Sequence, residues 1–315
     1  MTQSKEAKVL YYASPAAMIR SLCRDFLLLQ LFCFSTSFPP NPKIDLKGII
    51  LCMNIDETTS NLLEAIANGL KNDEFKMYLQ FIVDNKTKSI VSAEALSRWE
   101  KEDNVLIFPG QYIGVMEESG MITTLDYLMF EKACRKLSEW KDTEFRDISI
   151  SCNFTRITIS EVDFAAKIRE IAERYSFEHQ KLIMEITEES IEKNFEVAKG
   201  NLIHAKALGF TIALDDIGSG YTSLRNICDY PVDLVKLDRA MLLLTETERG
   251  KKLFYGIISL MHSLELKLVC EGVETEEQNA FVTASDCDFS QGWYYSTALS
   301  EAKAEAFAKE YTEKL

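Results

Sequence analysis

The stretch FTIALDDIGSGYTSLRNICDYPVDLVKLD, residues 210–238, contains the pattern that decides the fold. Its two apolar runs, residues 210–216 and 232–238, have the length and the Ile, Leu and Val content of buried strands. Each run ends in charged residues, and the glycines Gly218 and Gly220 between them are typical of a turn. The stretch is therefore interpreted as one repeat of an α/β fold with a parallel sheet.

The same alternation extends from residue 61 to the end of the chain. Residues 84–88 are too few for the helical crossover that parallel strands need, so the first two strands should be antiparallel. Eight strands in about 255 residues predict an α/β fold, a TIM-like (β/α)₈ barrel with one antiparallel strand. The predicted strands are residues 75–83, 89–99, 147–154, 181–187, 210–216, 232–238, 266–272 and a short run before Gln291, and the predicted helices are 125–140, 161–175, 190–209 and 246–264.

Residues 1–58 are predicted to be an N-terminal extension of unknown role, followed by the barrel domain over residues 59–315. Residues 39–42, which hold three of the six prolines, are the predicted linker. The apolar run FLLLQLFCF, residues 26–34, is far shorter than the roughly 20 residues that cross a bilayer, and we interpret it as a buried helix. Contact of this run with a membrane or a partner remains an alternative.

Composition excludes several function classes. The 35 basic and 49 acidic residues give a net charge of −14, which disfavours a nucleic-acid polymer as partner. The eight cysteines form no C-x-x-C pair and indicate reduced thiols in a cytoplasmic protein. Only three histidines are present, which disfavours histidine-based metal hydrolysis and Ser-His-Asp catalysis.

Polar residues end almost every predicted strand. In a barrel these ends converge on one face, and a carboxylate there is costly to bury without a cation or a hydrogen-bond donor. Carboxylate and amide oxygens are ligands that Mg²⁺ and Mn²⁺ prefer, and paired ions are a common device for phosphodiester hydrolysis. Lys236 could orient a water molecule or offset charge in the transition state. The polar residues are Asn153, Glu185, Asp215, Asp216, Lys236, Asp238, Glu271 and Gln291.

Short motifs follow one another in a fixed order along the predicted strands and the loops after them. The first, SAEALSRW, occupies residues 92–99 and contains Glu94. The others are MEESGMI (116–122), CNF (152–154), EITEES (185–190), LDDIGSGYTSL (214–224), VKLD (235–238), CEGVET (270–275) and SQGWYY (290–295).

In these motifs the chain resembles the EAL domains, the bacterial cyclic di-GMP phosphodiesterases. The resemblance covers about 250 positions, and eight ordered motifs are far more specific than the bare tripeptide. It implies a TIM-like barrel that hydrolyses cyclic di-GMP to linear pGpG. It also implies two divalent ions per active site, Mg²⁺ or Mn²⁺, and a homodimer that forms through the barrel.

The resemblance assigns roles to residues at matching positions. Asp215 would be shared between the two ions and Asp216 would serve the second. Glu271 and Lys236 would support the attacking water, and Glu188 would brace the loop of residues 217–221. The implied ligands of the first ion are Glu94, Asn153, Glu185 and Asp215, and the implied substrate contacts are Gln80, Leu96, Arg98, Asp238 and Gln291.

The chain departs from the family pattern at Phe81, Ile217 and Ala298, where the family usually has proline, phenylalanine and proline. None of these is an implied metal ligand. Catalytic hydrolysis is the leading hypothesis because no implied ligand is missing. The alternatives are a weak or inactive module that acts as a cyclic di-GMP receptor or protein-interaction domain, and a phosphodiesterase for another nucleotide or phosphate ester.

Overall fold

The computed structural model describes residues 57–101, 105–187, 195–218 and 224–315. The chain divides into two compact units, Met1–Asn68 and Gly69–Leu315, and helix α3 (Glu57–Lys71) begins in the first and ends in the second. The barrel belongs to the second unit. The predicted linker and the apolar run at residues 26–34 lie outside the described residues, and the proposed domain boundary at residue 59 stays a prediction.

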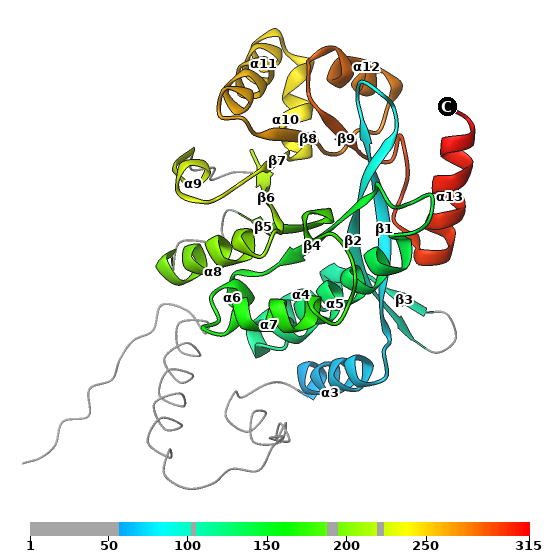
Figure 1. Cartoon of the computed structure of the whole chain (residues 1–315), viewed down its shortest axis with the longest axis vertical. Helices are drawn as coiled ribbons and strands as arrows, with labels where there is room; N and C mark the ends of the chain where they lie inside the picture. The colour runs from blue at the N-terminus through cyan, green and yellow to red at the C-terminus, as the bar shows by residue number, and fades with distance from the viewer. Residues whose placement is uncertain (1–56, 102–104, 188–194, 219–223) are drawn as a thin grey trace, which may run out of the picture. The chain divides into compact units, whose positions relative to one another are not determined.

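Eight strands close into a barrel (Figure 1). Strands β1 (Phe75–Asp84) and β2 (Ile90–Lys101) pair antiparallel, as their short connection predicts. Six parallel strands follow from β2, and the last of them pairs antiparallel with β1 and closes the sheet. The predicted (β/α)₈ barrel with one antiparallel strand is confirmed. The six strands are β4 (Ser149–Phe154), β5 (Leu182–Thr187), β6 (Thr211–Ile217), β7 (Leu234–Leu237), β8 (Lys267–Cys270) and β9 (Phe289–Gln291).

Two further strands extend the sheet beside the hairpin. The first, β3 (Val105–Ile107), pairs antiparallel with β2, and the second, β10 (Leu299–Ser300), pairs antiparallel with β1. Neither was predicted, because two or three residues show no alternation of apolar and polar side chains. The strands β7 and β8 are also shorter than predicted, so that Glu271 lies just beyond the end of β8.

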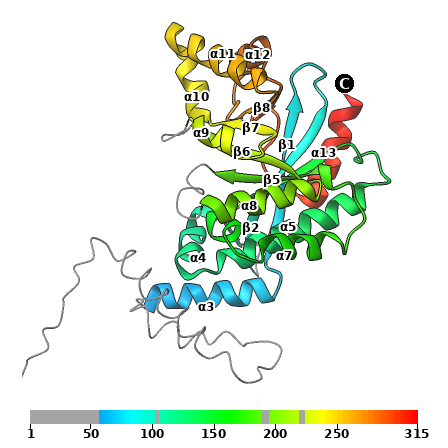
Figure 2. The same ribbon diagram turned by 60° about the vertical axis from the view of Figure 1, so that its left-hand side comes forward.

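Helices cover the outside of the barrel, and Figure 2 shows α5, α7 and α8 together on one side of it. The predicted helices correspond to α5, α7, α8 and α11, although residues 190–194 of the third lie outside the described residues. Helix α11 begins where Thr247 Oγ1 accepts a hydrogen bond from the Gly250 amide. The helices are α4 (Ile113–Ser119), α5 (Ile122–Trp140), α6 (Arg156–Ile159), α7 (Phe164–Ala172), α8 (Phe195–Ala207), α9 (Leu224–Asp229), α10 (Arg239–Leu243), α11 (Glu248–Ser263), α12 (Glu276–Ala284) and α13 (Glu301–Glu313), with 3₁₀ turns η2 (Pro109–Gln111), η3 (His179–Lys181) and η5 (Leu244–Glu246).

The barrel interior is filled by side chains from opposite strands. Ile82 of β1, Leu234 of β7 and Val269 of β8 belong to one buried cluster, against which the half-buried Phe289 packs. Aromatic rings pack between the sheet and the helices. The ring centroids of Phe130 in α5 and Phe154 in β4 are 5.6 Å apart. Apolar side chains therefore fix both faces of the sheet, and burial of this area supplies the main driving force for folding.

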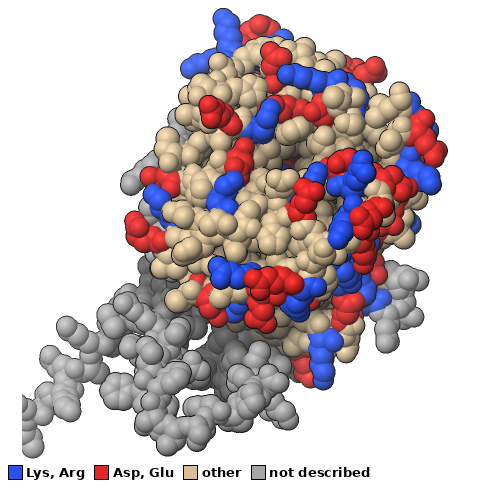
Figure 3. Space-filling view, viewed as in Figure 1, with Lys and Arg blue, Asp and Glu red and all other residues tan. Residues whose placement is uncertain are grey.

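Within the described residues, no helix combines the length and the apolar character needed to traverse a bilayer. On the face seen in Figure 3, acidic and basic side chains are interspersed rather than gathered by sign. Ion pairs also join α5 to α13, where Lys136 contacts Glu301 and Glu305. The acidic excess of the chain is thus not collected in one patch on this face.

Ile82→Ala should lower the free energy of unfolding by about 2–5 kcal/mol, because it leaves a cavity inside a packed barrel. Chemical denaturation measures the change. The control is Val162→Ala, whose side chain is 93% exposed and whose loss should matter by less than about 0.5 kcal/mol. Equal effects of the two substitutions would contradict a packed interior.

Candidate active site

The predicted polar residues meet at the carboxyl ends of the parallel strands. In β4 and β5, Asn153 pairs directly with Glu185, and Glu94 of β2 stands opposite Ser151 two residues earlier in β4. Asp215 is the third residue from the end of β6, and Lys236 is the third of the four residues of β7. The apolar runs set this register, and the register carries the polar ends of the strands into one space at the barrel mouth.

Lys236 lies at the centre of this space with only 1% of its surface exposed. Its ammonium group contacts one oxygen from each of four carboxylates. The Nζ atom is 2.7 Å from Glu271 Oε1, 3.0 Å from Glu185 Oε2, 3.2 Å from Glu94 Oε2 and 3.5 Å from Asp215 Oδ2. One positive charge therefore faces four acidic groups in a region shielded from water.

Glu94 is held by two amides as well as by Lys236. Asn153 Nδ2 donates to Glu94 Oε1 at 3.0 Å, and Gln291 Nε2 donates to Glu94 Oε2 at 2.6 Å. Burial opposes ionisation of Glu94, but the charge of Lys236 and these hydrogen bonds outweigh it and lower the pKa of the carboxyl group. Glu94 is thus the group of the cluster most readily ionised.

The other carboxyl groups resist ionisation. Burial raises the pKa of Glu185 well above its ordinary value and raises that of Asp215, although the charge of Lys236 acts in the opposite direction. Burial also raises the pKa of Glu271 to about 8. Burial and the charge of Asp215 raise the pKa of Asp216 to about 6. The cluster therefore contains more carboxyl groups than the single positive charge of Lys236 can neutralise.

Asp215, Asp216 and Glu271 bring one oxygen each to within 4.8 Å of one another. Asp216 adopts a left-handed backbone conformation with φ of 62°, which aspartate tolerates better than most residues. Its amide donates to Asp215 Oδ1 at 2.8 Å. The turn at the end of β6 thus brings two consecutive carboxylates into reach of the one that follows β8.

The donor set fits hard divalent cations. Glu185 is fully buried, and its Oε1 atom has no hydrogen-bond partner of good geometry among the described residues. The same holds for Gln291 Oε1 within the described part of the chain. Unpaired buried oxygens and an excess of carboxylates are stabilised by cations with a preference for oxygen, such as Mg²⁺ and Mn²⁺.

The EAL domain family matches residues 62–298 of the chain. The chain belongs to this family. Members of the EAL family that act as phosphodiesterases generally depend on divalent metals, in keeping with the acidic cluster.

Among curated relatives of this EAL chain is the cyclic di-GMP phosphodiesterase NbdA of Pseudomonas aeruginosa, 28% identical over 249 residues, which cover 79% of this chain and 32% of NbdA. The bifunctional diguanylate cyclase/cyclic di-GMP phosphodiesterase MucR of the same organism is 30% identical over 233 residues, 74% of this chain and 34% of MucR. The chain therefore spans about one third of the length of these relatives.

Solved structures agree with the family assignment. The PaMucR phosphodiesterase in complex with c-di-GMP has a TM-score of 0.72 and 28% identity, over 78% of this chain and 99% of that one. An EAL domain protein from Listeria monocytogenes shares the fold, with a TM-score of 0.70 and 24% identity over 80% of this chain and 97% of that one.

The residues that the EAL resemblance assigns to substrate lie mostly on the hairpin beside the cluster. Gln80 of β1 pairs with Glu94 across the hairpin, and its Nε2 donates to the Ser296 carbonyl at 3.1 Å. Leu96 and Arg98 follow Glu94 at alternate positions of β2 and therefore share its face. Among the expected substrate contacts, Gln291 alone belongs to the Lys236 cluster through its bond to Glu94.

Asp238 and Glu188 are the remaining predicted residues, and the charge of Asp238 contributes to the raised pKa of Asp216. Asp238 Oδ1 accepts a hydrogen bond from the Ala240 amide at 2.8 Å and so caps helix α10. Its predicted contact with substrate remains untested. Glu188 lies outside the described residues.

A glycine that sequence reasoning missed joins two loops of the barrel mouth. Gly292 follows Gln291, and a Cβ atom there would lie 2.1 Å from the Val273 carbonyl oxygen. The Val273 amide donates to the Gln291 carbonyl at 3.1 Å, and the Val273 carbonyl accepts from the Tyr294 amide at 3.0 Å. Only glycine allows this approach, which ties the loop carrying Glu271 to the end of β9.

Asp126 of α5 is a second residue that the sequence did not single out. Its Oδ2 atom accepts hydrogen bonds from the Thr155 amide at 2.9 Å, from Thr155 Oγ1 at 2.7 Å and from Thr158 Oγ1 at 2.6 Å. Burial raises the pKa of this carboxyl group to about 6. Asp126 thereby fixes the turn that begins two residues after Asn153.

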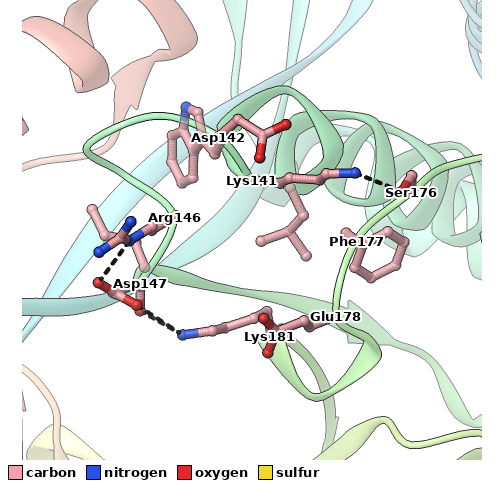
Figure 4. A pocket seen from close by; sticks show the side chains of 11 residues that line it. Lys141, Asp142, Arg146, Asp147, Ser176, Phe177, Glu178 and Lys181 are labelled. Atoms are coloured by element: carbon pink, nitrogen blue, oxygen red, sulfur yellow. Dashed lines mark hydrogen bonds and ion pairs between the residues drawn. The ribbon is translucent and has the colours of Figure 1, made fainter.

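A separate hollow of about 500 Å³ lies at the amino ends of β4 and β5, away from the strand ends that carry the cluster (Figure 4). Lys141 donates to Ser176 Oγ at 2.9 Å on one side of it, and Lys181 lies near Asp147 on another. Its lining has charges of both signs and contains none of the predicted site residues.

Lys236→Met should destabilise the metal-free protein by about 3–5 kcal/mol, because four buried carboxylates would lose their only ammonium partner among the described residues. Denaturant titration in EDTA at pH 8 measures the loss. The control is Lys251→Met, which removes an exposed ion pair with Glu248 and should cost about 1 kcal/mol or less. A Lys236→Met protein as stable as the control would contradict the electrostatic account.

Proposed function

We propose that this chain hydrolyses cyclic di-GMP to linear pGpG with two Mg²⁺ or Mn²⁺ ions at the barrel mouth. The observation that carries the proposal is the Lys236 cluster, in which one ammonium meets four carboxylates. Relatives named cyclic di-GMP phosphodiesterases make this dinucleotide the best-supported substrate.

The ions would be held by the residues expected from the resemblance. When bound, they supply Lewis acidity toward a phosphodiester oxygen and favour the ionisation of water. Asp215 would be shared, because it contacts Lys236 on one side and lies beside Asp216 and Glu271 on the other. The proposed ligands are Glu94, Asn153, Glu185, Asp215 and Asp216.

Side chains of this protein would support the attacking water and stabilise the negative charge that develops on the phosphate. Glu271, which brings an oxygen to within 4.8 Å of oxygens of Asp215 and Asp216, would support the attacking water, directly or through the second ion. Lys236 holds Glu271 at 2.7 Å and would offset negative charge that develops on the phosphate. The proposed substrate contacts are Gln80, Leu96, Arg98, Asp238 and Gln291, with Arg98 on a phosphate and Glu188 bracing the adjacent loop.

The competing hypothesis is that the chain is a receptor that binds cyclic di-GMP without hydrolysing it. Degenerate modules would be expected to lack a metal ligand, and every proposed ligand is present in this chain. The replacement at Ile217 is accommodated, because its side chain is buried and its carbonyl accepts from the Asp238 amide at 3.1 Å. These observations favour catalysis over binding alone.

Purified protein should release pGpG from cyclic di-GMP in Mg²⁺ or Mn²⁺ and lose this activity in EDTA. Glu94→Gln should reduce kcat by roughly a hundredfold or more, because it removes a charge from the metal cradle. Chromatographic separation of the nucleotides measures the product. Glu170→Gln, an exposed glutamate on α7, is the control and should hydrolyse like the wild type.

Binding of cyclic di-GMP by the wild type with no turnover in either metal would favour the receptor. Turnover of other cyclic nucleotides at higher kcat/KM would favour a different phosphodiesterase substrate.

We also propose that the chain forms a homodimer through the barrel. Exposed leucines lie on α10, η5 and α11 and directly after α11, where a second copy could cover them. Two of them, Leu253 and Leu260, are seven residues apart and so lie on one side of α11. The exposed leucines are Leu243, Leu244, Leu253, Leu260 and Leu264.

Leu260→Asp should shift the chain from dimer to monomer, because it places a charge in an apolar interface. Light scattering coupled to size-exclusion chromatography measures the mass. Val162→Asp changes an exposed residue outside α10 and α11 and should leave the mass unchanged. A wild type that is monomeric at high micromolar concentration would refute this part of the proposal.

A further inference from the structure

The guanidinium group of Arg98 lies against two aromatic rings on the hairpin side of the barrel mouth. Its Cζ atom is 5.3 Å from the centroid of the Phe108 ring and 5.8 Å from that of Tyr78. Its Nη1 donates to the Ser97 carbonyl at 2.9 Å. No carboxylate of the described residues forms an ion pair with it, so its charge is held by rings rather than neutralised.

Both rings are themselves fixed. Tyr78 stands opposite Leu96 in the hairpin, and its hydroxyl donates to Glu100 Oε1 at 2.7 Å. Phe108 follows β3, and its backbone is anchored by Gln111, whose amide donates to the Phe108 carbonyl at 2.9 Å. Gln111 Oε1 in turn accepts from the Phe108 amide at 3.3 Å. The Tyr78 hydroxyl and the Phe108 backbone are therefore held by contacts other than Arg98.

Phe108 is 53% exposed, so one face of its ring is open to the Arg98 guanidinium at the barrel mouth. The face of an aromatic ring attracts a guanidinium group and favours parallel stacking. A carboxylate in the same place would hold Arg98 more strongly, but it would cancel the charge and occupy the N–H donors. An aromatic ring restricts the Arg98 side chain and leaves its charge and its free N–H donors available to an anion.

We propose that Phe108, together with Tyr78, is a positioning residue that presets Arg98 for the phosphate of the substrate. The inference rests on the proposed function, in which Arg98 contacts a phosphate of cyclic di-GMP. A long arginine side chain loses conformational freedom when it binds, and prior immobilisation reduces that loss. The contribution should appear in substrate binding and not in the chemical step.

The test compares Phe108→Leu, which keeps apolar bulk without a ring face, with Phe108→Tyr, which keeps the ring. Phe108→Leu should raise KM for cyclic di-GMP by roughly threefold to tenfold and leave kcat within about twofold. Its dissociation constant in Ca²⁺, measured by calorimetry, should rise by the same factor. Phe108→Tyr should match the wild type, as should the control Val105→Ala on β3, whose side chain is also exposed.

A double-mutant cycle with Arg98→Met separates positioning from packing. In the Arg98→Met background, Phe108→Leu should have no further effect on KM, because there is no cation left to hold. Equal KM values for wild type and Phe108→Leu, or an undiminished effect of Phe108→Leu in the Arg98→Met background, would overturn the inference while the proposed function stands. A wild type that neither binds nor hydrolyses cyclic di-GMP would overturn both.

Discussion

The barrel mouth depends on one buried ammonium. Lys236 is the point at which Glu94, Glu185, Asp215 and Glu271 meet, at distances from 2.7 to 3.5 Å. Buried charges are tolerated only when they are paired, and a single cation cannot pair four anions. Burial raises the pKa of Glu185, Asp215 and Glu271, although the charge of Lys236 acts in the opposite direction. The barrel mouth, where strands from separate parts of the chain converge, therefore favours the binding of further positive charge.

The surrounding structure serves to hold that arrangement. The interior cluster around Ile82 and Val269 sets the register of the strands, and the close approach of Gly292 to Val273 ties two loops of the mouth together. Asp126 fixes the turn after Asn153 from the side of α5. Arg98 lies on the hairpin face that continues from Glu94, where an anionic substrate that approaches the cluster would meet it. In the proposed function, metal affinity and substrate affinity would thus come from adjacent parts of one face.

Sequence patterns predicted the barrel and the convergence of polar residues at its strand ends, because both depend on the local order of apolar and polar residues. Apolar runs marked the strands, and residues such as Asn153, Glu185 and Lys236 stood out as polar interruptions within them. The short strands β3 and β10 carried no such pattern. The stacking of Phe108 on Arg98 and the role of Asp238 as a helix cap depend on the path of the chain between elements, which alternation does not reveal. Both Gly292 and Val273 were visible in the sequence, but their close approach in the fold was not.

Anomalous scattering from a crystal of the protein grown with Mn²⁺ would locate bound ions directly. Two manganese peaks are expected at the barrel mouth, in contact with oxygens of Glu94, Asn153, Glu185, Asp215 and Asp216. A mouth that stays free of manganese at millimolar Mn²⁺, with Lys236 as the sole cation among ionised carboxylates, would contradict this expectation.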